Sequence, residues 1–111
     1  MPADLLQGKL DMLILKTLED ESLHGYAIAQ RIEQASRTLL SVPQGSLYPA
    51  LHRLENRGWL AASWVETDSG RSAKVYRLTT KGRRHLEKEI ADWQRLSQAI
   101  GWVLRLEGNA S

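Results

Sequence analysis

The first third of the chain carries apolar residues at steps of three and four, the spacing that places them on one face of a helix. Leucines and isoleucines at this spacing predict a first helix over residues 4–18, followed by a polar turn. A second helix is predicted over residues 25–35, with Tyr26, Ala29 and Ile32 turned inward. Both patterns are those of helices that bury one face and expose the other.

A leucine pattern predicts a third helix, in which one face is shared by Leu47, Leu51 and Leu54. Gly58 fits the position just after its end, where a positive φ costs a glycine little. Pro49 conflicts with a helix interior, because it has no N–H and its ring collides with the preceding turn. The helix is therefore predicted to begin near Ser46 or Leu47, with Ser46 as its cap and Pro49 at the third helical position.

The second half of the chain predicts a hairpin followed by a long helix. Residues 59–65 and 73–78 have the composition of strands, and the turn between them contains one glycine. Thr79 or Thr80 is placed to cap a last helix that runs to about residue 106. This order predicts a mainly α fold with a small β-hairpin (α+β), a winged helix-turn-helix with a long C-terminal helix.

Charge is distributed unevenly along the chain. The net charge is only +2, but residues 71–84 hold six basic and no acidic side chains, while acidic residues dominate the first 24 positions. Two interpretations remain open: a surface for an anionic partner, or a solvated basic stretch near a helix start. The chain has no cysteine, which excludes disulfides, thiolate zinc sites and a cysteine nucleophile.

The predicted third helix and hairpin together favour DNA binding. In a helix-turn-helix unit the later helix lies in the major groove, and its polar side chains meet phosphates and base edges. Polar residues on an ordinary surface helix are the alternative interpretation. The predicted DNA-binding residues, with the last two at the hairpin tip and acting mainly on phosphate, are Gln44, Ser46, Tyr48, His52, Arg53, Arg57, Arg71 and Lys74.

Three segments of the chain carry recognisable motifs: residues 24–26 (HGY), residues 45–55 (GSLYPALHRLE) followed by Arg57-Gly58, and residues 76–82 (YRLTTKG). Together they resemble the PadR family of bacterial transcriptional regulators, and residues 45–55 are similar to the recognition-helix motif of that family. The resemblance covers nearly the whole chain and implies a homodimeric winged helix, usually a repressor, on a palindromic double-stranded operator. It also implies the compact subfamily, which has a single C-terminal dimerisation helix. Residues 70–74 are less basic than wings common in the family.

The last helix carries an apolar seam that one small domain has no other way to bury fully: Leu86, Ile90, Trp93, Leu96, Ile100, Val103 and Leu104. A homodimer is therefore predicted, with a winged-helix DNA-binding domain over residues 1–79, a dimerisation helix over 80–107 and a disordered tail over 108–111. The resemblance implies a second role for Trp93, because in some compact members a tryptophan here stacks on flat aromatic effectors between protomers. Simple interface packing of Trp93 is the stronger alternative.

An enzyme is not predicted. The three histidines lack metal-ligand spacing, and the chain has neither a phosphate-binding loop nor a nucleophile elbow, so no cofactor and no metal are expected. With no signal peptide and no membrane-length apolar segment, the protein is expected in the cytoplasm, away from membranes. The predicted function is a sequence-specific DNA-binding transcriptional regulator. The alternatives are a small-molecule (multidrug-type) sensor in the dimer groove and a dimeric interaction module that does not bind DNA.

Overall fold

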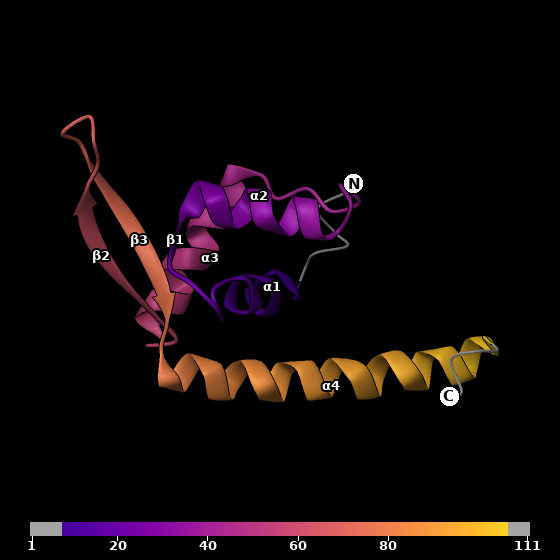
Figure 1. Cartoon of the computed structure of the whole chain (residues 1–111). Helices are drawn as coiled ribbons and strands as arrows, with labels where there is room; N and C mark the ends of the chain where they lie inside the picture. Colours follow the sequence, from indigo (N-terminus) through magenta and orange to yellow (C-terminus); the bar gives the residue numbers. More distant parts are fainter. Residues whose placement is uncertain (1–7, 107–111) are drawn as a thin grey trace.

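The computed structural model describes residues 8–106 and confirms the predicted α+β winged helix (Figure 1). The elements in chain order are α1 (Leu10–Thr17), β1 (Leu23–His24), α2 (Gly25–Ala35), α3 (Gln44–Asn56), β2 (Leu60–Glu66), β3 (Ser72–Leu78) and α4 (Thr80–Leu104). The hairpin of β2 and β3 rises from one end of α4, and the three shorter helices lie beside it. The molecule is elongated, with extents of 56 × 29 × 21 Å. Residues 108–111, predicted as a disordered tail, lie outside the described part.

α1 is shorter than predicted within the described residues. Gly8 and Lys9 form a turn, and the φ of Gly8 is +79°, so the helix cannot continue through this residue towards the N-terminus. α2 has the predicted bounds, but the inward orientation of Tyr26 is wrong, since this residue is 62% exposed. Tyr26 lies about 120° around the helix from Ile32. The buried face consists of Gly25, Ile28, Ala29 and Ile32.

α3 begins earlier than predicted. Pro43 is its cap, with no capping side chain, and the carbonyl of Pro43 accepts the amide of Leu47 at 3.0 Å. The predictions that Ser46 caps the helix and that Pro49 lies at the third helical position are therefore wrong. Pro49 lies at the sixth position, so the carbonyl of Gly45 has no amide four residues later to accept from.

The end of α3 is as predicted. Gly58 has a φ of +77°, and two amides close the last turn. The N–H of Gly58 donates to the carbonyl of Glu55 at 3.0 Å, and the N–H of Trp59 donates to that of Leu54 at 3.1 Å. This pair of bonds is the Schellman motif, which satisfies carbonyls that a helix end leaves free.

The sheet has three strands rather than the two of a simple hairpin. β2 and β3 pair antiparallel from Leu60 opposite Leu78 to Glu66 opposite Ser72, within one residue of the predicted bounds. β1 pairs with the other edge of β3, which gives the order β1-β3-β2. β1 was not predicted, because a strand of two residues is too short to show an alternating pattern.

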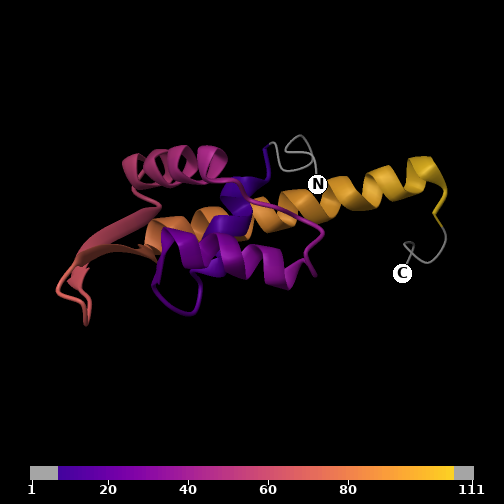
Figure 2. The same cartoon turned by 90° about the horizontal axis from the view of Figure 1, so that it is seen from above.

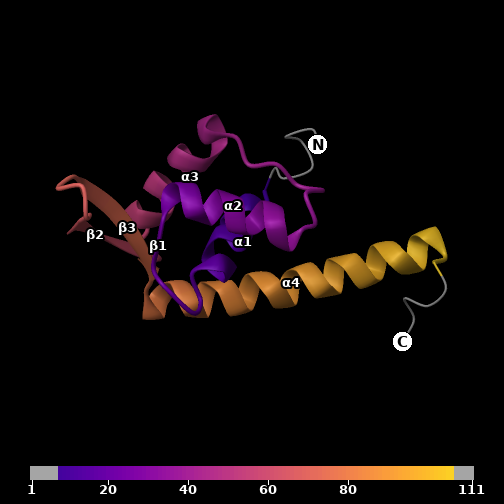
Figure 3. The ribbon, with the colours of Figure 1, turned by 45° about the horizontal axis from the view of Figure 1, so that its top comes forward.

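α4 is capped as predicted, since the hydroxyl of Thr79 accepts the N–H of Gly82 at 2.9 Å. Its first turns pack on the body, where Leu86 is fully buried and Ile90 partly buried. Figure 2 and Figure 3 show the second half of α4 extending past the other elements. A helix that leaves the body in this way exposes its apolar side chains.

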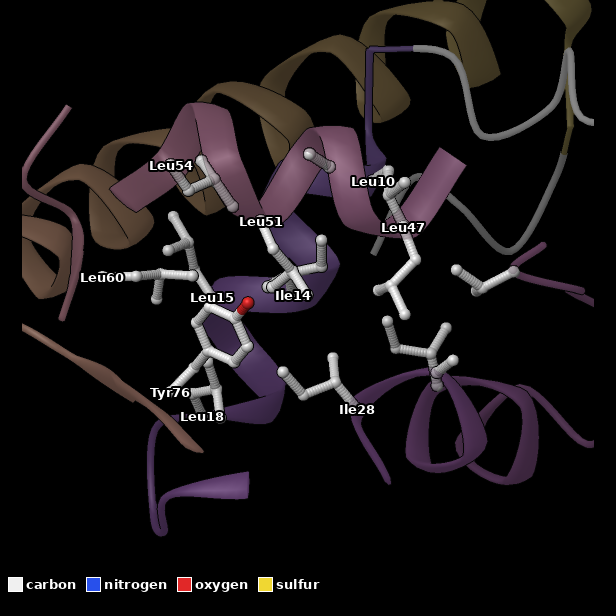
Figure 4. Close-up of a cluster of buried hydrophobic side chains, with 14 of the residues drawn as sticks. Leu10, Ile14, Leu15, Leu18, Ile28, Leu47, Leu51, Leu54, Leu60 and Tyr76 are labelled. Atoms are coloured by element: carbon white, nitrogen blue, oxygen red, sulfur yellow. The ribbon is translucent and has the colours of Figure 1, made fainter. Parts of the chain in front are cut away.

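The core lies between α1, α2, α3 and the sheet (Figure 4). Ile14 and Leu15 of α1 are fully buried at its centre, between Leu51 of α3 and Tyr76 of β3. Burying such aliphatic side chains contributes roughly 1.5–3 kcal/mol each. The core therefore fixes the inner face of α3 and leaves its outer face free for another role.

Candidate nucleic-acid interface and dimerisation helix

α3 has one face in the core and one face in solvent. The buried side chains, each at most 1% exposed, are Leu47, Ala50, Leu51 and Leu54. The exposed positions are Gln44, Gly45, Tyr48, Pro49, His52, Arg53, Asn56 and, just after the helix, Arg57. Ser46 is half-buried. In Figure 2, α3 lies along the outer side of the helical body, next to the start of the hairpin.

Tyr48 is anchored at one edge and exposed at the other. It is 44% exposed, so it is not a core residue. Its ring lies over the first residue of α2: a Cβ added to Gly25 would be 2.9 Å from Cε1 of Tyr48 and 3.3 Å from its hydroxyl. A side chain at residue 25 would therefore displace the ring, which is one physical reason for the glycine.

Lys74 does not lie at the hairpin tip, and this part of the prediction is wrong. It is inside β3, opposite Trp64 of β2. Its ammonium lies 3.1 Å from Oε1 of Glu55 on α3, and this hydrogen bond raises the pKa of Lys74 above its usual value. Glu55 is the sole acidic residue of α3, so the pair neutralises the one charge on this helix that would repel a polyanion.

Arg53 is paired with Asp11 of α1. Nη2 of Arg53 donates to Oδ1 at 2.5 Å, and Nε donates to Oδ2 at 3.4 Å. Both side chains remain partly exposed. Arg53 was predicted to lie at the DNA, but its partner Asp11 was not predicted, because the two residues are 42 positions apart.

The hairpin tip is held by Thr67. Its N–H and its hydroxyl both donate to the carbonyl of Arg71, at 2.7 and 2.9 Å. Gly70 has a φ of +83°, which suits its place in this tight turn. The side chain of Arg71 is exposed, as the prediction of a phosphate contact requires.

Trp64 is an exposed residue of the hairpin that was not among the predicted site residues. It is 68% exposed and lies on the same face of the sheet as Lys74, which faces α3. Its place in the sequence could have identified it, because a large aromatic residue lies here at the end of a predicted strand, next to a polar turn. It adds an apolar surface to the angle between the hairpin and α3.

The six basic residues of 71–84 divide into two groups. Lys74 is paired with Glu55, Lys81 donates to a backbone carbonyl at 2.9 Å, and Arg83 lies 3.7 Å from the carboxylate of Glu19. These three cations therefore serve contacts within the protein. Arg71, Arg77 and Arg84 are exposed.

A set of hydrogen bonds, here called the α3–α4 joint, ties the start of α4 to the end of α3. Its acceptors are the carbonyls of residues 57–59, which receive the ammonium of Lys81 (2.9 Å), the hydroxyl of Thr79 (2.7 Å) and the N–H of Thr79 (3.1 Å). Gly82 packs closely here, since a Cβ would lie 2.1 Å from the carbonyl oxygen of Trp59. These contacts fix the start of α4 against the end of α3, and the packing of α4 on α1 holds the helix further along.

The predicted dimer seam divides into a buried and an exposed part. Leu86 is 0% exposed within the protomer, so it has no surface left for a partner, and its assignment to an interface is wrong. Ile90 is partly buried against the same core. The remaining members of the seam are exposed: Trp93, Leu96, Ile100, Val103 and Leu104. Trp102, on the same half of α4, is 60% exposed and enlarges this apolar region.

Trp93 lies where α4 leaves the body. The ammonium of Lys9 is 5.4 Å from the centroid of its ring, a cation–π contact that joins the start of α1 to α4. Trp93 is 41% exposed, so part of its surface remains accessible to a partner or a planar ligand. The aromatic effector stays a prediction.

Within residues 8–106, no group of three or more histidine or carboxylate side chains could hold a metal ion. In the same part of the chain, every helix is too short or too polar to cross a membrane. His85, one of the three histidines, is stacked on Trp59 with ring centroids 3.6 Å apart.

Comparison with known sequences identifies relatives over most of the chain. Residues 14–88 match the model of the transcriptional regulator PadR-like family. The transcriptional regulator Rv3488 of Mycobacterium tuberculosis is 36% identical over 99 residues, which are 88% of this chain and 89% of that protein.

Solved structures share the fold. A PadR family transcriptional regulator from Eggerthella lenta matches with a TM-score of 0.81 and 32% identity, over 94% of this chain and 88% of that one. A PadR-like transcriptional regulator from Bacillus cereus matches with a TM-score of 0.78 and 27% identity, over 94% of this chain and 99% of that one. Regulators of this family are not enzymes, so the expectation of a non-catalytic protein is confirmed. The chain belongs to the PadR-like family of transcriptional regulators.

Proposed function

We propose that the protein is a sequence-specific DNA-binding repressor that acts in the cytoplasm as a homodimer on a palindromic operator. The observation that carries this proposal is the exposed face of α3. This face is polar, the one acidic residue of α3, Glu55, is neutralised by Lys74, and a hairpin with an exposed arginine at its tip stands beside it. Regulators of the PadR-like family bind DNA, typically as dimers.

In this proposal α3 lies in the major groove. Its hydroxyl, amide, imidazole and guanidinium groups meet base edges and phosphate oxygens there. The residues concerned are Gln44, Ser46, Tyr48, His52, Arg53 and Arg57. Arg71 contacts phosphate from the hairpin tip, and Lys74 acts indirectly, by removing the charge of Glu55 from the surface that approaches DNA.

The exposed apolar half of α4 supports the dimer. Five large apolar side chains of the predicted seam are at least 40% exposed there, and a second copy of the chain would cover them. A two-fold dimer presents two copies of α3 to half-sites about 34 Å apart, one turn of DNA. This geometry is the reason for expecting a palindromic operator.

The salt dependence of DNA binding tests the proposal. A binding site is selected from a random DNA pool, and fluorescence anisotropy measures the Kd of the wild-type protein from about 50 to 200 mM salt. We expect a palindromic site and a Kd that rises steeply with salt, because each phosphate contact releases counterions. Weak binding without salt dependence would contradict the proposal and favour a dimeric interaction module.

Arg71→Ala sharpens the same experiment. Loss of one phosphate contact should weaken binding to all sequences and lower the salt slope by about one. Arg95→Ala is the matched control, because Arg95 is an exposed arginine of α4 that pairs with Asp92 at 2.5 Å, far along the chain from the hairpin. If Arg71→Ala changed the base preference and left the salt slope unchanged, the conclusion would be that Arg71 reads a base rather than contacts a phosphate.

Repression is tested separately. A reporter promoter that contains the selected site should give less product when the wild-type protein is co-expressed. Higher output would identify an activator and leave the DNA-binding part of the proposal intact.

A further inference from the structure

The pair formed by Arg53 and Asp11 uses one edge of the guanidinium and leaves another edge free. Asp11 occupies the Nε–Nη2 edge, with contacts of 3.4 and 2.5 Å. Within residues 8–106, Asp11 is the one residue to which Arg53 donates side-chain hydrogen bonds, and none of them involves Nη1. The Nη1–Nη2 edge therefore remains available to a ligand, and the side chain is 45% exposed.

Both ends of the pair are fixed by the core. Asp11 follows Leu10 and precedes Met12 in the first turn of α1, and both of these neighbours are buried. Arg53 precedes Leu54, which is 0% exposed. The carboxylate thus holds the guanidinium from a rigid helix, so the free edge has a defined direction before any ligand binds.

We propose that Asp11 is a positioning residue that holds Arg53 so that its free edge reads a guanine in the major groove. This inference rests on the proposed DNA-binding function. The Nη1–Nη2 edge of an arginine carries two parallel donors, which match O6 and N7 of guanine. A guanidinium already held in one orientation loses less conformational freedom when it forms such a bond.

A base rather than a phosphate is the target because of the charge of the pair. Asp11 cancels the charge of Arg53 locally, and a neutral pair attracts a phosphate poorly. The carboxylate fixes the orientation of the guanidinium. Orientation matters for two directed hydrogen bonds to a base edge and much less for the electrostatic attraction between a cation and a phosphate. Arg71 at the hairpin tip has no carboxylate partner among the described residues, as suits a phosphate contact.

The test compares the sites selected by wild type, Asp11→Asn and Arg53→Lys from a random DNA pool. Wild type should require guanine at one position of each half-site. Both variants should lose that preference at the same position, by about 5- to 150-fold, the discrimination of one bidentate contact. Arg53→Lys keeps the positive charge but removes the two parallel N–H donors of the guanidinium. Asp11→Asn keeps the shape of the side chain but removes its negative charge and one hydrogen-bond acceptor.

Further variants separate positioning from folding. The double variant Asp11→Asn/Arg53→Lys should discriminate no worse than Arg53→Lys alone, since the two residues act as one unit. Glu21→Gln is the control: it breaks the pair of Glu21 with Arg31, which are 2.8 Å apart, and should leave the selected site unchanged. Thermal unfolding of all variants should be nearly unaltered, because surface ion pairs add little stability.

Two results would overturn the inference. If Asp11→Asn binds every sequence more tightly and with a steeper salt slope, Asp11 only neutralises Arg53. If Asp11→Asn selects the wild-type site, Asp11 has no part in base reading. A wild-type protein that binds no DNA would instead contradict the proposed function itself, which is a different outcome of the same assay.

Discussion

The ring of Tyr48 rests on a residue that has no side chain, and this contact decides how the tyrosine can act. Gly25 lets Cε1 and the hydroxyl of the ring approach α2, and the residue as a whole remains 44% exposed. The hydroxyl forms no hydrogen bond with any of residues 8–106, so it is free to bond a phosphate. The fold therefore orients the ring of Tyr48 and leaves its hydroxyl without a hydrogen-bond partner among the described residues.

Removal of this hydroxyl alone is the sharpest test of Tyr48. Tyr48→Phe keeps the contact with Gly25 and should weaken DNA binding by about 0.5–1.5 kcal/mol, the net value of one hydrogen bond. Anisotropy titrations measure the loss, and the melting temperature should stay the same. A lower melting temperature with unchanged affinity would place the hydroxyl in the fold rather than at the DNA.

Gly45 is a glycine that the fold does not explain. A Cβ at this exposed position of α3 would have no neighbour within 4 Å, and the backbone there does not need a positive φ. Glycine in a helix costs about 0.5–1 kcal/mol relative to alanine. If α3 enters the major groove, the missing side chain lets the helix backbone come close to DNA.

Gly45→Ala should therefore change stability and binding in opposite directions. The melting temperature should rise by roughly 2–8 °C, because alanine favours the helix. DNA affinity should fall, because the added methyl group keeps the helix away from the bases. A stabilised variant with full affinity would show that residue 45 faces solvent in the complex.

At the scale of elements, the α3–α4 joint depends on Gly82. Alanine at this position would place a methyl group 2.1 Å from a backbone oxygen, which cannot move without shifting the end of α3. Gly82→Ala should lower the free energy of unfolding by about 1–3 kcal/mol or more. Chemical denaturation measures this free energy of unfolding. Gly45→Ala is the matched control, because its added methyl group would meet no neighbour within 4 Å. Equal stability of wild type and Gly82→Ala would mean that the joint can yield.

The elements also show what sequence could predict and where it failed. Regular patterns gave the bounds of α2 and, within one residue, those of β2 and β3. The start of α3 was wrong because its cap, Pro43, uses only its backbone, whereas the prediction relied on the hydroxyl of Ser46. Periodicity placed Leu86 and Ile100 on one seam of α4, but it could not tell which part of that seam the protomer buries itself.

The outward position of most of the candidate residues on α3 was predictable from the sequence, and their pairings were not. The polar residues of α3 could be selected by their position opposite the leucines. The partners of Arg53 and Lys74 could not, because Asp11 and Glu55 come from other parts of the chain. These contacts depend on how the helices and strands pack against one another. The periodicity of a single sequence describes each element separately and does not show which residues of two elements meet.

For the whole molecule, two aspartate substitutions on α4 separate the core from the dimer. Ile100→Asp, at a residue 45% exposed, should leave the fold intact and give a monomer. Leu86→Asp should unfold the protomer, because it buries an unpaired charge in the core. Light scattering gives the mass and circular dichroism gives the helix content. A stable wild-type monomer would contradict the dimer.

The α3–α4 joint makes α4 a lever arm. With 25 residues the helix is about 37 Å long, so a rotation of about 5° at the joint would displace its far end by roughly 3 Å. Successive base pairs of DNA are about 3.4 Å apart. If two protomers meet through their far ends, a small tilt at either joint shifts the two recognition helices relative to each other by nearly one base pair. Anything that wedges between α4 and the body would thus act on operator spacing without touching the DNA-binding surface.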